Sequence, residues 1–280
     1  TAGLYAGAVI ASTDQELLIL TMDRAVEQAD SIKVTFQNGI QADGVIKQVD
    51  AISGMAIVSV PVEQMDEKVL LQVEVLKLGN SYSMRQGDVV IAMGAPAGIV
   101  HSSAYGSISY VARNVQVADG TARLLYADVE SDARAGTFLV NMAGEVVGWA
   151  TDEYEEEGKD GMTVAVSVSD YKSVLEKMSN GQPVPYLGIY GQEVSAAMLS
   201  EDIPPGIYVT DCVLDGPAYA AGIQNGDIIV SVGGRDVFTI RDYQNQVETL
   251  SQDASVAVVV QRKGIDEYKE LEYQVIVGAR

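Results

Sequence analysis

Short alternations of polar and apolar residues fill the first part of the chain, up to about residue 165. Residues 31–36 alternate strictly, and residues 44–49 and 55–60 continue the pattern; this period of two predicts half-buried β-strands. Asn38 and Gly39 follow the first strand and predict a hairpin with positive φ at both turn residues. Residues 89–93 and 145–149 are apolar enough for a barrel interior. Many short strands between glycine-rich turns predict a sandwich or barrel.

A helix is predicted to close this region, with Ser169 as its N-cap and Asn180–Gly181 as a left-handed stop. Its apolar face is formed at helical spacing by Tyr171, Val174, Leu175 and Met178. Residues 182–185, Gln-Pro-Val-Pro, read as a short stiff linker. We therefore predict one domain over residues 1–180 and a second over residues 184–280.

The remainder of the chain predicts a smaller unit that mixes strands with one helix. The predicted strands are residues 207–210, 227–230, 256–260 and 271–275. Thr239 is the predicted N-cap of the helix, and Asp242 stands three residues later, as in a capping box. The apolar face of this helix consists of Ile240, Tyr243, Val247 and Leu250.

Composition excludes several classes of function. The chain has 280 residues, of which 48% are hydrophobic and 20% charged, and its net charge of -21 opposes binding to nucleic acid or to an anionic membrane surface. Cys212 and His101 are the only residues of their kinds, so no cysteine- or histidine-rich metal site is expected, and no cofactor is predicted. The longest apolar run, residues 89–100, is interrupted by glycine and proline and is too short to span a bilayer.

The stretch Phe-Leu-Val-Asn-Met-Ala-Gly-Glu-Val-Val-Gly-Trp, residues 138–149, carries a resemblance to a known family. It is similar to the strand-turn-strand that follows the nucleophile in HtrA-like serine proteases, the trypsin-type enzymes that carry PDZ domains. Residues 94–98, Gly-Ala-Pro-Ala-Gly, resemble a turn of the same family. The resemblance implies a mostly β fold, in which a trypsin-like double β-barrel precedes a PDZ domain with a groove helix.

Three positions in this resemblance correspond to the catalytic residues of the family. Residues 20–26, Leu-Thr-Met-Asp-Arg-Ala-Val, place Arg24 where the family has its histidine base. Residues 53–58 place Gly54 at the aspartate, and the nucleophile falls on Ala135, or on Arg134 after a shift by one residue. A guanidinium cannot accept the hydroxyl proton, and glycine and alanine offer no functional group. We therefore predict a catalytically inactive homologue that is not an enzyme.

Other residues are weaker candidates for chemistry. His101, followed by Ser102 and Ser103, is interpreted as a solvated loop residue, and Ser131 as a loop serine without a base. The acidic side chains Asp128, Glu130 and Asp132 are interpreted as solvated. Residues 152–157 carry the densest charge; a solvated loop is favoured there over a rim that attracts basic peptides or calcium, since the spacing fits no calcium loop.

Residues 185–189, Pro-Tyr-Leu-Gly-Ile, resemble the carboxylate-binding loop of a PDZ domain, and Gly-Pro-Ala at 216–218 and Gly-Asp-Ile-Ile at 226–229 follow in the family's order. Backbone N–H groups of such a loop point at a terminal carboxylate, and a strand edge receives the rest of the peptide. The predicted peptide-binding residues are Tyr186, Leu187, Gly188, Ile189, Tyr190, Tyr243 and Val247. The alternative is an occluded or vestigial groove.

These observations predict a protein that binds peptide segments or protein C-termini, as a scaffold, regulator or client-holding factor. Two alternatives are an active HtrA-type endopeptidase of protein quality control with a rearranged site, and a purely structural surface protein. The resemblance further implies a homo- or hetero-oligomer, a trimer by family analogy. It also implies a location outside the cytoplasm, at a bacterial surface, with membrane attachment only through an N-terminal anchor absent from this chain.

Overall fold

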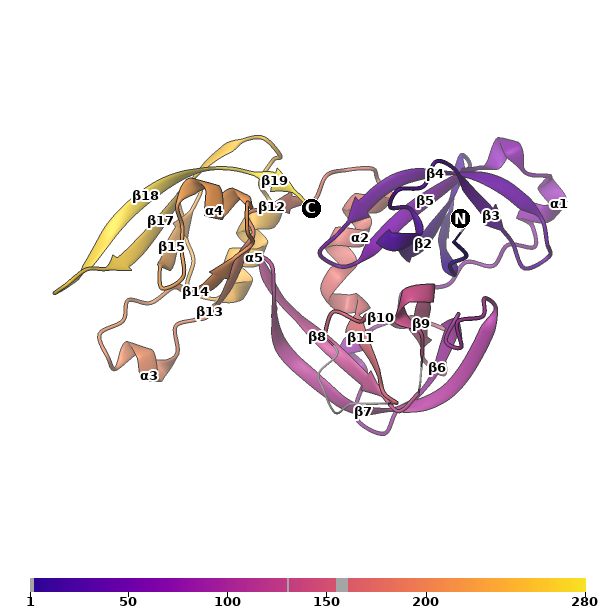
Figure 1. Ribbon diagram of the computed structural model, residues 1–280, viewed down its shortest axis with the longest axis horizontal. Helices are drawn as coiled ribbons and strands as arrows, with labels where there is room; N and C mark the ends of the chain where they lie inside the picture. The colour runs from indigo at the N-terminus through magenta and orange to yellow at the C-terminus, as the bar shows by residue number, and fades with distance from the viewer. Residues whose placement is uncertain (1–2, 130, 155–160) are drawn as a thin grey trace. The chain divides into compact units, whose positions relative to one another are not determined.

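The computed structural model describes residues 3–129, 131–154 and 161–280. The chain divides into two compact units (Figure 1). The first unit comprises Thr1–Arg113 and Arg123–Gln182, and the second comprises Asn114–Ala122 and Pro183–Arg280. The chain passes from the first unit to the second after Gln182, and nothing in the sequence indicated that Asn114–Ala122 belongs with the second unit. No helix in the described part of the chain is long and apolar enough to cross a bilayer.

The first half of the first unit is a five-stranded sheet with the order β1-β2-β5-β4-β3. Its strands are β1 (Gly7–Ser12), β2 (Glu16–Met22), β3 (Ile32–Thr35), β4 (Gln41–Asp50) and β5 (Met55–Pro61). The short helices of this half are η1 (Asp23–Ala25), η2 (Val62–Gln64), α1 (Glu67–Leu70) and η3 (Ser81–Ser83). Every residue of β2 except Glu16 and every residue of β5 except Pro61 is buried, as expected for these largely apolar strands. The expected hairpin at Asn38–Gly39 is present, but only Gly39 has positive φ, because a longer loop closes between Phe36 and Ile40.

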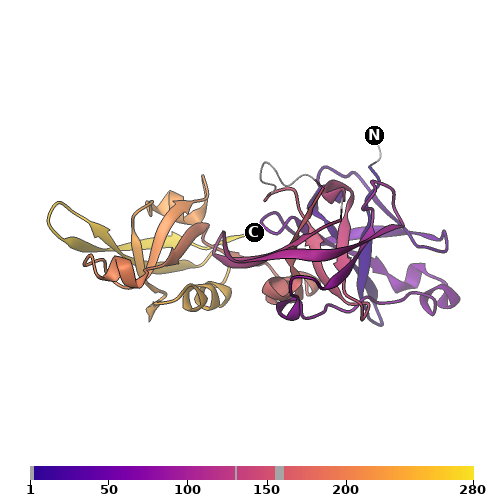
Figure 2. The ribbon, with the colours of Figure 1, turned by 90° about the horizontal axis from the view of Figure 1, so that it is seen from below.

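The second half of this unit forms a closed barrel with the strand order β10-β11-β8-β7-β6-β9. Its strands are β6 (Val89–Gly94), β7 (Ser102–Val117), β8 (Gly120–Ala127), β9 (Thr137–Val140), β10 (Val146–Ala150) and β11 (Thr163–Ser167), with η4 (Ala133–Ala135) before β9. Strands β7 and β8 make a long hairpin (Figure 2). The prediction of a mostly β fold is confirmed, although the hydrogen bonding of the described strands closes only this second half into a barrel.

The helical end of the first unit consists of η5 (Val168–Tyr171) and α2 (Lys172–Ser179). Val174, Leu175 and Met178 are buried as expected, and Gly181 has a φ of 64° beyond the helix end. The predicted N-cap Ser169 is wrong. Its hydroxyl accepts a hydrogen bond from the N–H of Ser81 at 2.9 Å, and Tyr171 holds the cap position of α2.

The second unit is built on a sheet with the order β13-β14-β15-β17-β18, with β16 paired to β15 and with the separate pair β12-β19. Its strands are β12 (Pro185–Tyr186), β13 (Ile189–Glu193), β14 (Ile207–Cys212), β15 (Ile228–Val232), β16 (Arg235–Asp236), β17 (Ser255–Lys263), β18 (Tyr268–Ile276) and β19 (Gly278–Ala279). Its helices are α3 (Ala196–Leu199), α4 (Pro217–Ala221) and α5 (Ile240–Glu248).

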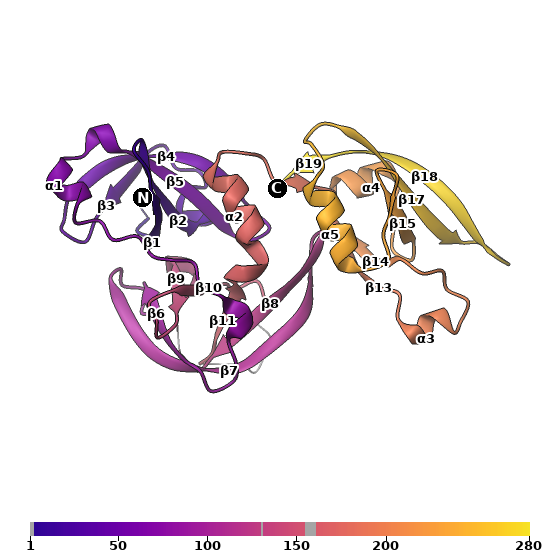
Figure 3. The same ribbon diagram turned by 180° about the vertical axis from the view of Figure 1, so that it is seen from behind.

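Helix α5 lies against β12 and β13 (Figure 3). It begins with the capping box predicted from Thr239 and Asp242, in which each residue accepts the backbone hydrogen bond of the other. Tyr243 and Val247 are buried against the sheet. Strand β13 is an edge strand, since its one strand partner among the described residues is β14.

Candidate functional site

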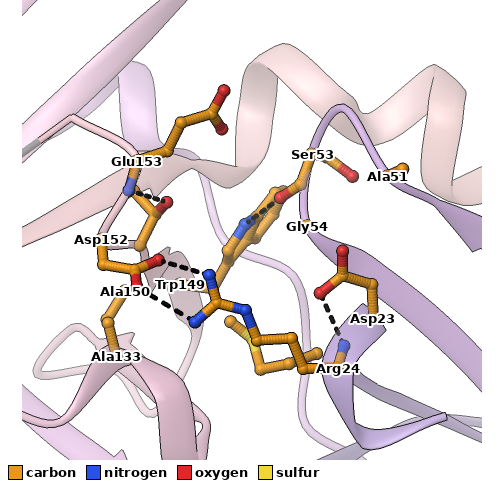
Figure 4. Close-up of a pocket in the computed structure, with 12 residues that line it drawn as sticks. Asp23, Arg24, Ala51, Ser53, Gly54, Ala133, Trp149, Ala150, Asp152 and Glu153 are labelled. Carbon is orange, nitrogen blue, oxygen red and sulfur yellow. Dashed lines mark hydrogen bonds and ion pairs between the residues drawn. The ribbon is translucent and has the colours of Figure 1, made fainter. Parts of the chain in front are cut away.

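A cavity of about 340 Å³ in the first unit brings together two of the three positions that the sequence singled out (Figure 4). Arg24 reaches it from η1, directly after β2, and Gly54 reaches it from the turn before β5. The lining is completed by Met22, Asp23, Ala51, Ser53, Ala133, Trp149, Ala150, Thr151, Asp152 and Glu153. The described lining therefore contains acids, one arginine and two hydroxyls, but no histidine.

Arg24 is bound by Asp152 in a two-pronged ion pair (Figure 4). Its Nη1 and Nη2 lie 3.0 and 3.2 Å from the two carboxylate oxygens, and Nε of Arg134 lies 3.0 Å from Oδ2 of the same carboxylate. These bonds raise the pKa of Arg24. Burial raises the pKa of Asp152, but the hydrogen bonds from Arg24 and Arg134 outweigh it, and the pKa of Asp152 is lowered overall. A guanidinium held in this way is a fixed positive charge rather than a proton acceptor.

Gly54 occupies a turn that the surrounding backbone holds in place. Its carbonyl accepts the N–H of Asp23 at 3.0 Å, and the indole Nε1 of Trp149 donates to the carbonyl of Ser53 at 3.1 Å. A side chain at Gly54 would meet no atom within 4 Å, but φ is 70°, a value that favours glycine. The position thus opens onto the cavity without contributing a functional group.

Ala135 lies at the end of η4 and contributes no reactive group. Its carbonyl accepts the N–H of Ala6 at 2.8 Å, while Asp132 caps the short helix through the N–H of Arg134. The neighbouring residues Ala133 and Arg134 reach the cavity and its ion pair. Two of the three predicted positions, Arg24 and Gly54, therefore line the cavity, whereas Ala135 itself does not and only its neighbours reach the cavity or its ion pair. That the three positions correspond to the catalytic residues of the family stays a prediction.

The weaker candidates lie elsewhere or serve local structure. His101 is exposed with a φ of 63°, and no described hydroxyl hydrogen-bonds to its imidazole. The hydroxyl of Ser131 accepts from that of Thr163 at 2.6 Å, and Asp128 accepts from the backbone and hydroxyl of Ser107. Glu130 and residues 155–157 of the acidic run lie outside the described residues. Within the described part of the chain, no group of three or more candidate metal ligands occurs.

The acidic run that begins at Asp152 predicts a solvated loop, but Asp152 joins Arg24 to Arg134. We expect Asp152→Asn to lower the free energy of unfolding at neutral pH by about 1 kcal/mol or less, because the three side chains are partly exposed. Since its pKa is lowered on folding, Asp152 stabilises above its unfolded pKa, and this contribution is lost as the pH falls through the folded value. Urea unfolding followed by the fluorescence of Trp149 at neutral and acidic pH measures this, with exposed Asp14→Asn as control. If the free energies of unfolding of the wild type and Asp152→Asn differed as much in strong acid as at neutral pH, the stabilising role of the Asp152 carboxylate would be contradicted.

The second site is the loop between β12 and β13, where three successive amides converge on one carboxylate. The N–H groups of Leu187, Gly188 and Ile189 donate to the side chain of Asp119 at 2.8 Å, 3.0 Å and 3.1 Å. The hydroxyl of Tyr243, on α5, donates to Oδ1 at 2.7 Å. Gly188 has a φ of 81°, and this turn is what directs the amides to one point.

The remaining predicted peptide-binding residues surround this loop. Leu187, Ile189, Tyr243 and Val247 are buried, and Tyr190 on β13 is half-buried. Burial and the charge of Asp119 raise the pKa of Tyr186 to about 12, so its hydroxyl is protonated at neutral pH. Burial raises the pKa of Tyr243 well above its ordinary value, which keeps this hydroxyl a hydrogen-bond donor.

Sequence reasoning missed Asp119 and Asp152. Asp119 precedes Gly120 between two alternating stretches, a hairpin signal that predicts a turn but not its binding partner. Asp152 lies in a run of acidic residues, which predicts a solvated loop and not an ion pair. Neither partner could be assigned locally, since Asp119 and Tyr243 are 124 positions apart and Arg24 and Asp152 are 128 positions apart.

Residues 6–148 match the model of the trypsin-like peptidase domain. This chain belongs to the trypsin-like peptidase family. Residues 208–262 match the PDZ domain, so the chain is an HtrA-like, trypsin-type protease homologue with a PDZ domain.

Two relatives and one solved structure illustrate the similarity of this trypsin-like family member to known proteins. Serine protease Do-like HtrA of Bacillus subtilis is 25% identical over 288 residues, which cover 96% of the chain and 62% of the relative. Serine endoprotease DegS of Haemophilus influenzae is 27% identical over 255 residues, which cover 88% of the chain and 70% of the relative. The structure of the HtrA-type protease AlgW with a decapeptide shares the fold, with a TM-score of 0.66 and 22% identity. The match covers 99% of this chain and 83% of the AlgW chain. The chain spans less than two thirds of the length of the Bacillus subtilis relative.

The prediction that the chain is not an enzyme is contradicted by these comparisons. The similar proteins are named serine proteases and endoproteases, which points to a protease. The prediction rested on three aligned positions, whereas the similarity extends over 88–96% of the chain in these relatives.

Proposed function

We propose that this HtrA-like protein binds the carboxyl-terminal ends of polypeptides through its PDZ domain, outside the cytoplasm. One observation carries the proposal: the amides of Leu187, Gly188 and Ile189 hold a carboxylate. A terminal carboxylate presents the same two oxygens as the side chain that occupies the loop. The apolar residues around the loop favour a peptide with an apolar last residue.

The strand beside the loop supports the same mode of binding. β13 is an edge strand, and the N–H of Asp119 donates to the carbonyl of Ile189 at 2.8 Å. A peptide added alongside β13 would continue such backbone bonds, while α5 forms the opposite wall. The structure of AlgW with a decapeptide is consistent with peptide binding in proteins of this fold. The location follows the relatives named as periplasmic, and membrane anchoring and trimer formation remain proposals from the family.

An array of decapeptides with every residue at the last two positions tests the proposal. We expect binding of apolar C-termini to fall at least tenfold when the carboxylate is amidated, because the three amides then lose a charged acceptor. Gly188→Val should abolish the preference, since its Cβ would lie 2.8 Å from the hydroxyl of Tyr186 and φ is positive. Gly234→Val is the matched control, with positive φ but open space around it. Equal binding of free and amidated peptides would contradict the proposal.

Peptide-bond hydrolysis is the second candidate, favoured by the names of the relatives. By the family resemblance, hydrolysis would take place at the cavity lined by Arg24 and Gly54. Burial raises the pKa of both Asp23 and Glu153, so two carboxyl groups there are more readily protonated than usual. Turnover of fluorescent casein that increases with protein concentration, and is absent from a mock purification of the same host, would support hydrolysis. Equal signals from both preparations would contradict it.

A further inference from the structure

The carboxylate-binding loop of the PDZ domain is filled by a residue of the chain itself. Asp119 stands between β7 and β8, in the segment Asn114–Ala122 that belongs to the second unit. Its exposed fraction is 1%, and its side chain is bonded to three amides and to the hydroxyl of Tyr243. Its own N–H bonds to the carbonyl of Ile189. This set of partners is what the loop and the first position of the strand edge would offer to a peptide end.

The backbone of the hairpin tip, residues 117–120, holds the Asp119 carboxylate in the loop. Asp119 has a φ of 61°, a left-handed conformation that aspartate and asparagine tolerate better than most residues. The two preceding residues, Val117 and Ala118, are buried as well. Gln116 adds a hydrogen bond from the hydroxyl of Thr210 at 2.9 Å. The tip is therefore a packed part of the second unit rather than a loop that touches it.

We propose that Asp119 is an internal ligand of the carboxylate-binding loop, and that a polypeptide C-terminus binds only after the hairpin tip has left it. The inference rests on the proposed function. The three amides cannot serve two carboxylates at once, and two carboxylates in one buried site repel each other. The apparent affinity for a peptide is then the intrinsic affinity multiplied by the fraction of molecules with an open loop.

Asp119→Asn tests the inference because asparagine keeps the size and the left-handed backbone but removes the charge. We expect this variant to bind free C-termini at least tenfold more tightly than the wild type on the same decapeptide array, and in polarisation assays with the best-bound peptide. Asp253→Asn is the matched control: Asp253 is exposed, has a φ of 63° and lies in the same unit. It should bind as the wild type does.

A measurement on the wild type guards against a variant that fails to fold. Peptide binding usually slows amide hydrogen exchange, but here a saturating free-carboxylate peptide should speed exchange across residues 117–120, because the tip is displaced. Equal affinity of wild type and Asp119→Asn, with unchanged exchange at the tip, would overturn the inference and leave the proposed function intact. If neither the wild type nor Asp119→Asn distinguished free from amidated C-termini on the array, both the inference and the proposed function would be overturned.

Discussion

Replacing Trp149 with alanine is expected to lower the free energy of unfolding of the first unit by about 3–5 kcal/mol. Trp149 is fully buried in β10, and its ring packs edge-on against Tyr171 with centroids 5.4 Å apart. Its indole also donates to the carbonyl of Ser53, next to Gly54. The variant therefore loses a large packed volume and leaves a buried carbonyl without its donor.

Urea unfolding followed by far-UV circular dichroism measures this loss, since Trp149 is the chain's only tryptophan and its fluorescence disappears with it. The unfolding of the first unit has to be resolved from that of the second, because a chain of two units need not unfold in one step. Trp149→Phe keeps most of the ring volume and should cost clearly less. A loss below 1 kcal/mol for Trp149→Ala would show that the ring does not hold the cavity wall.

Replacing Arg262 with methionine is expected to destabilise the second unit by about 3 kcal/mol, the lower end for breaking a buried ion pair. Asp227 is fully buried before β15, and the Nε and Nη2 of Arg262 lie 2.6 and 2.7 Å from its two oxygens. Without Arg262 the carboxylate keeps the N–H of Gln224 at 3.0 Å but no positive charge. The lower figure applies because 28% of the Arg262 side chain is exposed, so water reaches the pair.

Hydrogen exchange of the β15 and β17 amides, read with urea unfolding, measures the change in the second unit. The double variant Asp227→Asn with Arg262→Met removes the unpaired charge and should be more stable than Arg262→Met alone. A double variant less stable than the single one would contradict the assignment of the loss to an uncompensated buried carboxylate.

Local signals predicted most of the fold correctly. Every stretch expected to be a strand forms one, the capping box at Thr239 is present, and α2 ends before Gly181. These signals depend on residues a few positions apart, whose spacing decides which side chains share a face or reach a backbone group. Ser169 shows the limit, because its hydroxyl bonds to Ser81, 88 positions away, instead of capping the next helix.

For the same reason, the sequence predicted some residues of the candidate sites and missed others. The loop from Leu187 to Ile189 followed from its resemblance to the carboxylate-binding loop of PDZ domains, a turn that neighbouring residues form among themselves. The positions of Arg24 and Gly54 followed from the family resemblance, and the structure brings both to one cavity. The prediction drawn from them was wrong on the enzyme question, because the similar proteins are named serine proteases and endoproteases.

The sequence by itself determined the strands, the capping box of α5, the trypsin-like family and, through the resemblance to PDZ domains, the turn that can hold a carboxylate. Only the tertiary structure decided that Asp152 binds both Arg24 and Arg134, and that Asp119 fills the loop. Hydrogen bonds between groups 18, 69 and 128 positions apart have no signature in local spacing. They exist because the fold brings distant groups to hydrogen-bond distance, and at Asp119 it also buries the carboxylate away from water.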